Sequence, residues 1–241
     1  MNKYYYDLHI HSCLSPCADN DSTPASIAGM AAVIGLDVVA LTDHNSARNC
    51  PAFFEAAEAY GIIAIAGMEL TTSEDVHMVC LFPTLDAALS FNDLVDERRM
   101  PVKNRPDIFG EQLICNADDE VIGEVDNLLS VATSISIEEL PSLIDGYGGI
   151  CYPAHIDRDA NGIIAVLGTL PDTPHFNTVE MRDPDKLPEY SARYSLFDRR
   201  VVFNSDSHML GVMNEREHFI EMDVDTDDRE RFVYELLSLM R

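Results

Sequence analysis

The chain has 241 residues, of which 46% are hydrophobic and 24% charged, a composition typical of a folded globular protein and not of a disordered one. Its 42 acidic and 16 basic residues give a formal net charge of −26, which repels polyanions and anionic membranes, so we expect neither a membrane nor extended nucleic acid as a partner. The start, MNKYYYDLHIH, lacks the apolar stretch of a signal peptide, which predicts a cytoplasmic protein; the oligomeric state stays open.

The first third of the chain alternates β-rich and helical segments. Strands are expected at 4–11, 37–45, 62–70 and 77–83, and helices at 25–34 and 51–60. Ser22-Thr23-Pro24 supplies a cap and a first-turn proline, and Gly35 and Gly61 end the two helices. Strands recur at 148–157, 177–183, 200–208 and 219–224, before an amphipathic helix at 230–241. This alternation predicts an α/β fold with a parallel sheet, in one domain over residues 1–241.

The segment at about 84–146 departs from that rhythm. It contains helical pieces, the charged stretch ERRMPVKNRPD, and QLICNADDEVIGEV, which is typical of a hairpin turned at Asp118-Asp119. We interpret it as an insertion or lid.

Six of the eight histidines and two carboxylates fall at strand ends. In a barrel of parallel strands, the carboxyl ends meet at one face. Residues at positions i and i+2 of a strand point the same way, so each of the pairs His9/His11 and Asp206/His208 can reach one site. Imidazole and carboxylate suit zinc, manganese or iron, and a carboxylate can bridge two ions. The pattern predicts a centre with two or three divalent metal ions, built from His9, His11, His44, Glu69, His77, His155, Asp206 and His208.

The motifs DLHIHSCLSP, LTDHN, GMEL, VHMV, PAHID and NSDSH follow one another in an order that resembles the PHP (polymerase and histidinol phosphatase) family. The resemblance covers nearly the whole chain. It implies a distorted (β/α)7 TIM-like barrel with a trinuclear metal site and phosphoester hydrolysis. The first ion would bind His9, His11, Glu69 and Asp206; the second Glu69, His77 and His155; and the third His44, His208 and a residue of the loop after the first strand.

That last ligand is the one place where this sequence departs from the family pattern. Pro16 occupies the usual position, which leaves Asp19 and Asp21 as substitutes. We expect Asp19, because the family's loop aspartate lies about five residues before a proline that opens the next helix, here Pro24. Asp21 is placed instead to cap that helix.

Three arginines are candidates for binding a phosphate. Arg158 follows His155 and is the expected bidentate clamp, with Arg48 and Arg182 as further substrate-binding candidates. We expect Glu69, Asp206 and Arg158 to be catalytic.

Several other polar residues are expected to support the site or the fold without binding metal or substrate. Asp43 is expected to orient a ligand, and His175 and His218 are interpreted as structural. Cys13 and Cys17, spaced C-x-x-x-C beside the histidines, are interpreted as structural or near-site thiols, with a metal or redox role as the alternative.

Together these features predict a metal-dependent phosphatase. A water activated by the ions would attack the phosphorus of a small phosphorylated metabolite. Two alternatives stay open: a phosphodiesterase or 3′→5′ exonuclease, and a non-catalytic metal-binding regulatory module.

Overall fold

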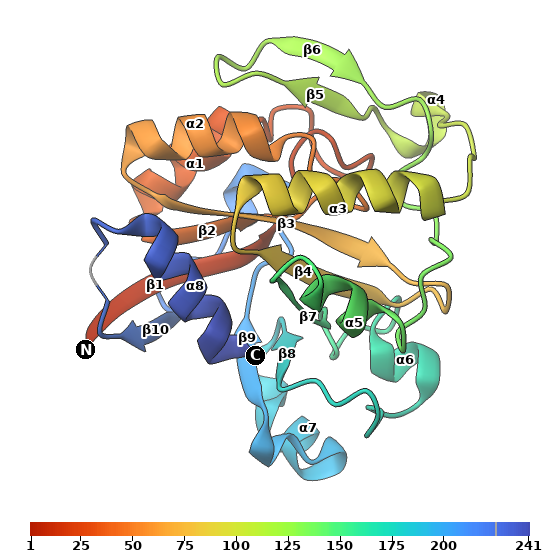
Figure 1. The fold of residues 1–241 in the computed structure, drawn as a ribbon, viewed down its shortest axis with the longest axis vertical. Coiled ribbons are helices and arrows are strands. Elements are labelled where there is room, and N and C mark those ends of the chain that lie inside the picture. The colour runs from red at the N-terminus through yellow and green to blue at the C-terminus, as the bar shows by residue number, and fades with distance from the viewer. Residues whose placement is uncertain (225) are drawn as a thin grey trace.

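A curled β-sheet covered by helices forms the centre of the computed structural model, which describes residues 1–224 and 226–241 (Figure 1). Within this part of the chain, the main sheet has the strand order β10-β1-β2-β3-β4-β7. These strands are β1 (Asn2–Ile10), β2 (Val38–Leu41), β3 (Ile63–Thr71), β4 (His77–Phe82), β7 (Ile150–Pro153) and β10 (Phe219–Met222). The helices are α1 (Pro24–Ile34), α2 (Cys50–Tyr60), α3 (Leu85–Arg98), α4 (Pro106–Phe109), α5 (Leu140–Asp145), α6 (Ile163–Leu167), α7 (Leu187–Tyr194) and α8 (Arg229–Met240).

The first two helices begin and end as their sequences predict. Thr23 is the N-cap of α1, where its side chain accepts a hydrogen bond from the Ser26 amide, and Pro24 opens the first turn. Gly35 and Gly61 end α1 and α2 in the left-handed conformation that glycine adopts without strain. Because Thr23 caps α1, the capping role expected for Asp21 is wrong.

The sheet is mixed, so the expectation of a parallel sheet holds only for part of it. Strands β1, β2 and β3 are parallel, but β4 runs antiparallel to both β3 and β7. Only residues 72–76 connect β3 to β4, which is too short for the crossover that a parallel pair requires. The chain therefore turns straight back. As a result, β4 begins at the edge where β3 ends, and this places His77 there.

The sheet curls into a half-barrel, in agreement with the expected TIM-like α/β fold. The parallel pair β8 (Thr178–Met181) and β9 (Arg200–Phe203) lies between its two edges. The Ile156 amide bonds the Glu180 carbonyl, and Ser207 forms a parallel bridge with Ile10. The strands that carry the motifs therefore surround a common interior.

Alternate residues of the strands fill this interior. Tyr6, Leu8, Ile65, Val79 and Tyr152 belong to one buried cluster, which the apolar face of α8 completes. The other face of the sheet packs against α1, α2 and α3 through a second cluster. Helices therefore cover the sheet outside, while α8 closes one end of the interior and leaves the other for polar residues.

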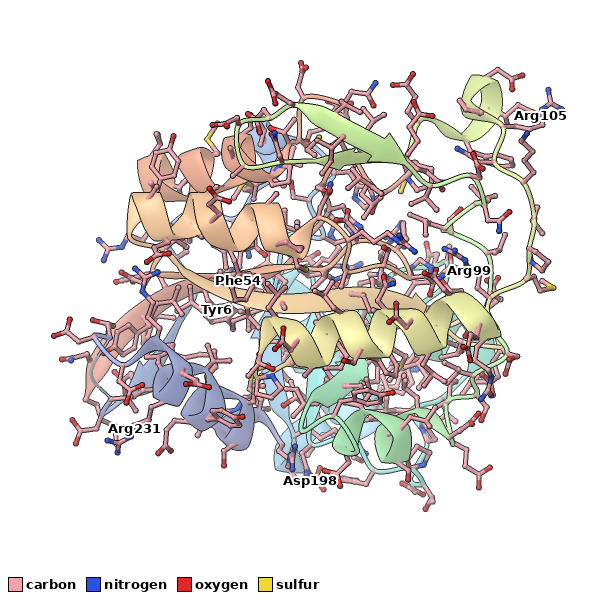
Figure 2. The ribbon with its side chains drawn as sticks, turned by 45° about the horizontal axis from the view of Figure 1, so that its top comes forward. Tyr6, Phe54, Arg99, Arg105, Asp198 and Arg231 are labelled. Carbon is pink, nitrogen blue, oxygen red and sulfur yellow. The ribbon has the colours of Figure 1, made fainter. Side chains whose placement is uncertain are left out.

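The segment 84–146 includes α3, α4, α5 and the hairpin of β5 (Leu113–Cys115) and β6 (Val121–Glu124) that was predicted there. The hairpin packs on the loop that follows β1, where the Leu113 amide donates to the Cys13 carbonyl at 2.9 Å. Just before the hairpin, Gly110 lies so close to the Pro16 carbonyl that a Cβ at this position would clash with it. Figure 2 places Arg105 at the outer end of the piece that carries α4. That this segment is an insertion stays a prediction.

Short 3₁₀ turns at Pro184–Lys186, Leu196–Asp198 and Leu210–Val212 complete the described structure. No helix in the described residues is long and apolar enough to cross a membrane.

Candidate metal centre

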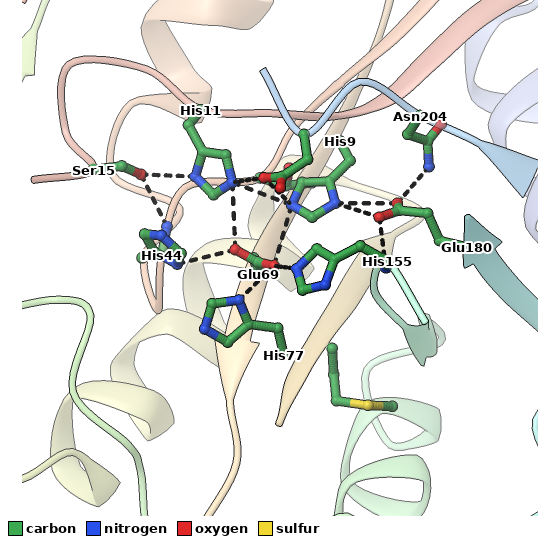
Figure 3. Close-up of polar contacts among 12 residues, drawn as sticks. His9, His11, Ser15, His44, Glu69, His77, His155, Glu180 and Asn204 are labelled. Carbon is green, nitrogen blue, oxygen red and sulfur yellow. Dashed lines mark hydrogen bonds and ion pairs between the residues drawn. The ribbon is translucent and has the colours of Figure 1, made fainter. Parts of the chain in front are cut away.

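Glu69 is the centre of a cluster of histidines at the open end of the half-barrel (Figure 3). It lies near the end of β3 and is fully buried. Its carboxylate oxygens lie within 3.4 Å of ring nitrogens from His9, His11, His44, His77 and His155. A single buried carboxylate with this many imidazoles around it has the arrangement of a bridging metal ligand.

Four side chains form the tightest group of potential ligands. All four are buried, and each offers a donor atom within 4.8 Å of the others: His9, His11, Glu69 and Asp206. His9 lies on β1, and His11 directly follows that strand. The His11 Nε2 lies 3.2 Å from the Asp206 Oδ1 and 3.3 Å from the Glu69 Oε2. These are the four residues that the resemblance to the PHP family assigned to the first ion; their binding of a metal stays a prediction.

The remaining predicted ligands form two further groupings. His44, Glu69 and His77 have mutually close donor atoms, as do His11, His44 and His208. The His155 Nε2 lies 2.9 Å from the Glu69 Oε1. The side chains of His77 and His208 are partly exposed, so the cluster reaches solvent on that side.

Sequence reasoning missed Glu180, which holds His9 in place. Glu180 lies on β8, is fully buried, and accepts a hydrogen bond from the His9 Nδ1 at 2.9 Å. It also accepts from the Asn204 side chain at 2.7 Å and from the His155 amide at 2.9 Å. The bond at Nδ1 leaves the His9 Nε2 free to face Glu69. A charged residue within the buried strand Thr-Val-Glu-Met was the signal that could have revealed it.

His11 is oriented in a similar way, through a serine. Its Nδ1 lies 3.0 Å from the Ser15 hydroxyl, which donates to Asp43 at 2.7 Å. Asp43 also accepts hydrogen bonds from the amide and hydroxyl of Ser12. Asp43 therefore contacts His11 only through Ser15, which fits the orienting role expected for it. Nothing in the sequence pattern distinguished Ser15.

Two residues of the cluster have an unusual backbone conformation. His155 and Asp206 follow β7 and β9 with φ angles of 28° and 49°. Such left-handed conformations cost non-glycine residues about 1–3 kcal/mol and persist only where the surroundings hold them. Here the His155 amide bonds Glu180, and the Asp206 carbonyl contacts the His208 ring. The two residues with this strained backbone also contribute their side chains to the cluster.

The charges of the cluster shift the pKa values of its members. Burial opposes ionisation of Glu69, yet the charges of His77, His9 and His44 hold its pKa well below the usual value. Burial likewise disfavours protonation of His11, but the carboxylates of Asp206 and Glu69 raise its pKa to about 9. Burial and the charge of His11 lower the pKa of His208 to about 3. Without metal, protons on some histidines therefore balance the carboxylates, and metal ions compete for these positions.

Buried polar atoms without partners favour metal ions at this site. The His44 Nδ1, the Glu69 Oε2, the His77 Nδ1 and the Asp206 Oδ1 are inaccessible to solvent and make no hydrogen bond of suitable angle in the described structure. They converge instead at short distances, such as 3.0 Å between the His44 Nδ1 and the Glu69 Oε2. Leaving such groups unpaired costs about 1–3 kcal/mol each. Imidazole nitrogens and carboxylate oxygens that converge in this way suit divalent transition metals. The residues of the cluster therefore fit the divalent metal ions that the sequence predicts.

The arginines predicted to bind substrate separate into two places. The Arg158 Nη1 lies 2.6 Å from the Asp206 Oδ2, and the Arg182 Nη1 lies 3.9 Å from the same oxygen. Both side chains are partly exposed at the edge of the cluster. Arg48 instead pairs with Asp96 on α3 at 2.7 Å, which gives its guanidinium a partner outside the cluster.

The other predicted residues lie apart from the grouped ligands. Asp19 and Asp21 are exposed on the loop after β1 and are absent from the groups found among the described residues. His175 contacts Arg199, and the His218 ring stacks on Phe203.

Comparison with known proteins identifies the family. The model of the PHP domain matches residues 7–150, which is more than half of the chain. The chain belongs to the PHP domain family. This PHP chain is therefore a metal-dependent hydrolase with clusters that can hold metal ions.

Similar structures share the fold at low sequence identity. The endonuclease Q of Pyrococcus furiosus has a TM-score of 0.63 and 18% identity, over 98% of this chain and 56% of the endonuclease. A proposed metal-dependent phosphoesterase from Bifidobacterium adolescentis has a TM-score of 0.58 and 20% identity, over 95% of each chain. A segment of 67 residues is 39% identical to an error-prone DNA polymerase of Nocardia farcinica and spans 28% of this chain and 6% of the polymerase.

These comparisons overturn the expectation that extended nucleic acid is no partner for a chain of this kind. Another structure with a TM-score of 0.63 is an endonuclease Q in complex with a 27-mer duplex substrate, with an abasic lesion at the active site. The argument from charge was wrong because a net charge of −26 describes the whole molecule. The local field at one pocket can differ in sign from the field of the whole molecule, as it does where cations or arginines gather.

Proposed function

We propose that this chain hydrolyses phosphoesters at a centre of two or three divalent ions. The observation that carries the proposal is the position of Arg158 and Arg182, whose guanidinium groups lie beside the Asp206 carboxylate at the open edge of the cluster. Guanidinium groups bind phosphate oxygens through paired hydrogen bonds. A phosphate held there would lie against the exposed edge of the histidine cluster.

The expected ligands form three sets, one for each ion. His9, His11, Glu69 and Asp206 would hold one ion, Glu69, His77 and His155 a second, and His44 and His208 a third. Divalent ions in these positions lower the pKa of a bound water and neutralise the oxygens of a transferring phosphoryl group. Glu180 and Ser15 keep the His9 and His11 rings in the orientation that presents Nε2 to the centre. The arginines bind and orient the phosphate.

A terminal phosphate on a small metabolite is the substrate class that we favour. A monoester phosphate carries about two negative charges near neutral pH, as phosphorylated side chains do, so it gains more than a diester from a cationic pocket. Phosphodiester cleavage in nucleic acid is the second candidate, and the similarity to endonuclease Q favours it.

One panel of substrates separates these functions. Protein loaded with zinc or manganese is assayed on a generic phosphomonoester, a generic phosphodiester and an abasic duplex DNA. Faster turnover of the monoester supports the phosphatase, whereas cleavage of the duplex with little monoester turnover supports the nuclease. A metal-loaded protein that cleaves none of them would be a non-catalytic metal-binding module, and the proposal would be wrong.

A further inference from the structure

The two arginines beside Asp206 come from different loops. Arg158 lies in the loop after β7, and Arg182 directly follows β8. Their Nη1 atoms lie 2.6 and 3.9 Å from the same Asp206 oxygen, although the side chains are 40% and 44% exposed. Two guanidinium groups repel each other at such an approach, and long exposed side chains lose conformational entropy when they are fixed. Bringing both to one oxygen therefore requires that the two loops be held relative to each other.

The loop of Arg158 is fixed largely by its own backbone. The Arg158 amide donates to the His155 carbonyl at 2.9 Å, and the His77 amide on β4 donates to the Asn161 carbonyl at 2.8 Å. Gly162 lies against this turn, where a Cβ would come within 3.0 Å of the His155 carbonyl oxygen and 3.2 Å of that of Arg158. The turn is thus closed at both ends before any substrate binds.

The backbone of Arg182 is held in a different way, by the side chain of Asp157. The Arg182 amide donates to the Asp157 Oδ1 and the Asp183 amide to the Asp157 Oδ2, each at 3.0 Å. The Lys186 Nζ contacts the Asp157 carbonyl at 3.2 Å. Hydrogen bonds from amides to a carboxylate are stronger than those between neutral groups. Residues 182–186 are therefore tied to the residue that directly precedes Arg158.

Asp157 is buried, at 5% exposure, and its two carboxylate oxygens are directed at backbone amides. It belongs to none of the groups of donor atoms found among the described residues that could hold a metal ion. Its position between the two arginine loops therefore fits a role in aligning them and not in binding an ion.

We propose that Asp157 is a positioning residue that aligns Arg182 with Arg158, so that the two guanidinium groups bind one phosphate together. Without the carboxylate, Arg182 would have to be ordered when the phosphate binds, which costs conformational entropy. The ions that activate water would stay in place. The effect should therefore appear in phosphate affinity and in KM, and much less in kcat. The inference rests on the proposed function and names the residue that organises its phosphate-binding side.

Asp157→Asn tests the proposal, because the side-chain nitrogen of asparagine cannot accept a hydrogen bond from an amide. Calorimetric titration of metal-loaded protein with inorganic phosphate measures the affinity, and a generic phosphomonoester gives KM and kcat. We expect the phosphate affinity to fall by about two- to tenfold, the cost of ordering one flexible side chain, with a matching rise in KM and unchanged metal content. Asp37→Asn is the control, since Asp37 accepts the Tyr5 amide at 2.8 Å before β2, at the end away from the cluster. It should bind phosphate normally.

A comparison with Arg182→Ala separates positioning from a general effect on the fold. If Asp157 acts through Arg182, the double variant Asp157→Asn/Arg182→Ala should bind phosphate as weakly as Arg182→Ala alone, because the group to be aligned is already absent. Losses that add in the double variant would show that Asp157 supports the fold in general and would overturn the proposal. Wild-type phosphate affinity in Asp157→Asn would overturn it too, and would leave the proposed function intact.

A measurement on the wild type keeps the proposal testable if the Asp157 variants do not fold. Amide hydrogen exchange of metal-loaded protein, read by peptide mass spectrometry, should slow in residues 155–160 and 180–186 at the same phosphate concentration. One phosphate that is held by both arginines restrains both loops. Slowing in only one loop would overturn joint binding. A metal-loaded wild type that neither binds phosphate nor cleaves an ester would overturn the proposed function as well.

Discussion

Both carboxylate oxygens of Glu180 contact the His9 ring, at 2.9 and 3.0 Å from Nδ1. The other ring nitrogen, Nε2, lies 3.4 Å from the Glu69 Oε1. His9 is thus held between two buried carboxylates, one that orients the ring and one at the centre of the cluster. A carboxylate that accepts the N–H of one ring nitrogen makes the other nitrogen of the histidine a better metal ligand.

Glu180→Gln should therefore weaken metal binding by about 10–100-fold, the usual cost of losing such a partner. The amide of glutamine would also place a donor against the Asn204 side chain or the His155 amide, both of which donate to Glu180. Competition with a chelator measures the affinity. Glu189→Gln, the same change on the exposed face of α7, is the control and should bind metal normally. Unchanged affinity in Glu180→Gln would mean that the contact does not support the centre.

Glu69→Gln should abolish both metal binding and hydrolysis, because this carboxylate contacts five of the histidines. Elemental analysis and the phosphomonoester assay measure the two effects. Glu58→Gln on the exposed part of α2 provides the matched comparison. A Glu69→Gln protein with full metal content and turnover would exclude the cluster as the active site.

Arg158→Ala should lower kcat/KM by about tenfold or more, since a hydrogen bond to a charged group contributes about 1.5–3 kcal/mol. The metal content should stay unchanged. Arg105→Ala removes an exposed arginine that pairs with Asp107 far along the α4 segment, and it should not alter turnover. If Arg158→Ala instead loses metal, the arginine acts by supporting Asp206 and not by binding phosphate.

Chelation should lower the melting temperature, because ions bound only by the native state stabilise it. Thermal unfolding is followed in the presence of chelator and after zinc is added back. The wild type should recover its stability with zinc, while Glu69→Gln should melt at the same temperature with or without chelator. An equal response of the two proteins would indicate that the stabilising metal binds elsewhere.

Asn45→Ala should destabilise the fold by about 2–4 kcal/mol, because Asn45 joins the segment 84–146 to the sheet. Its side chain donates to the carbonyls of Leu129 and Val131 and accepts the Thr71 amide. Urea unfolding measures the change. Asn45 has a φ of 47°, so Asn45→Gly, which tolerates that angle, separates the lost hydrogen bonds from backbone strain. Near-native stability of the glycine variant would show that strain, not bonding, dominates.

The sequence alone determined the main strands and the residue types that lie at or near their ends. The spacing of His9 and His11 points both side chains the same way, because side chains alternate along a strand. Glu69 lies near the end of β3, His77 begins β4, and the other grouped ligands lie within or just beyond the last residues of a strand. The hairpin at Asp118-Asp119 was equally visible, since turn residues act locally.

Only the tertiary structure decided which groups meet. The short connection after β3 turns β4 antiparallel, and this brings the start of that strand, with His77, to the ends of its neighbours. Glu180 reaches His9 because β8 lies beside β7 and close to β1 in the curled sheet, and the Ser15 hydroxyl reaches both the His11 ring and the His44 amide because the loop after β1 folds back over the cluster. Local patterns do not encode such contacts, since they depend on strand order and on how distant segments pack.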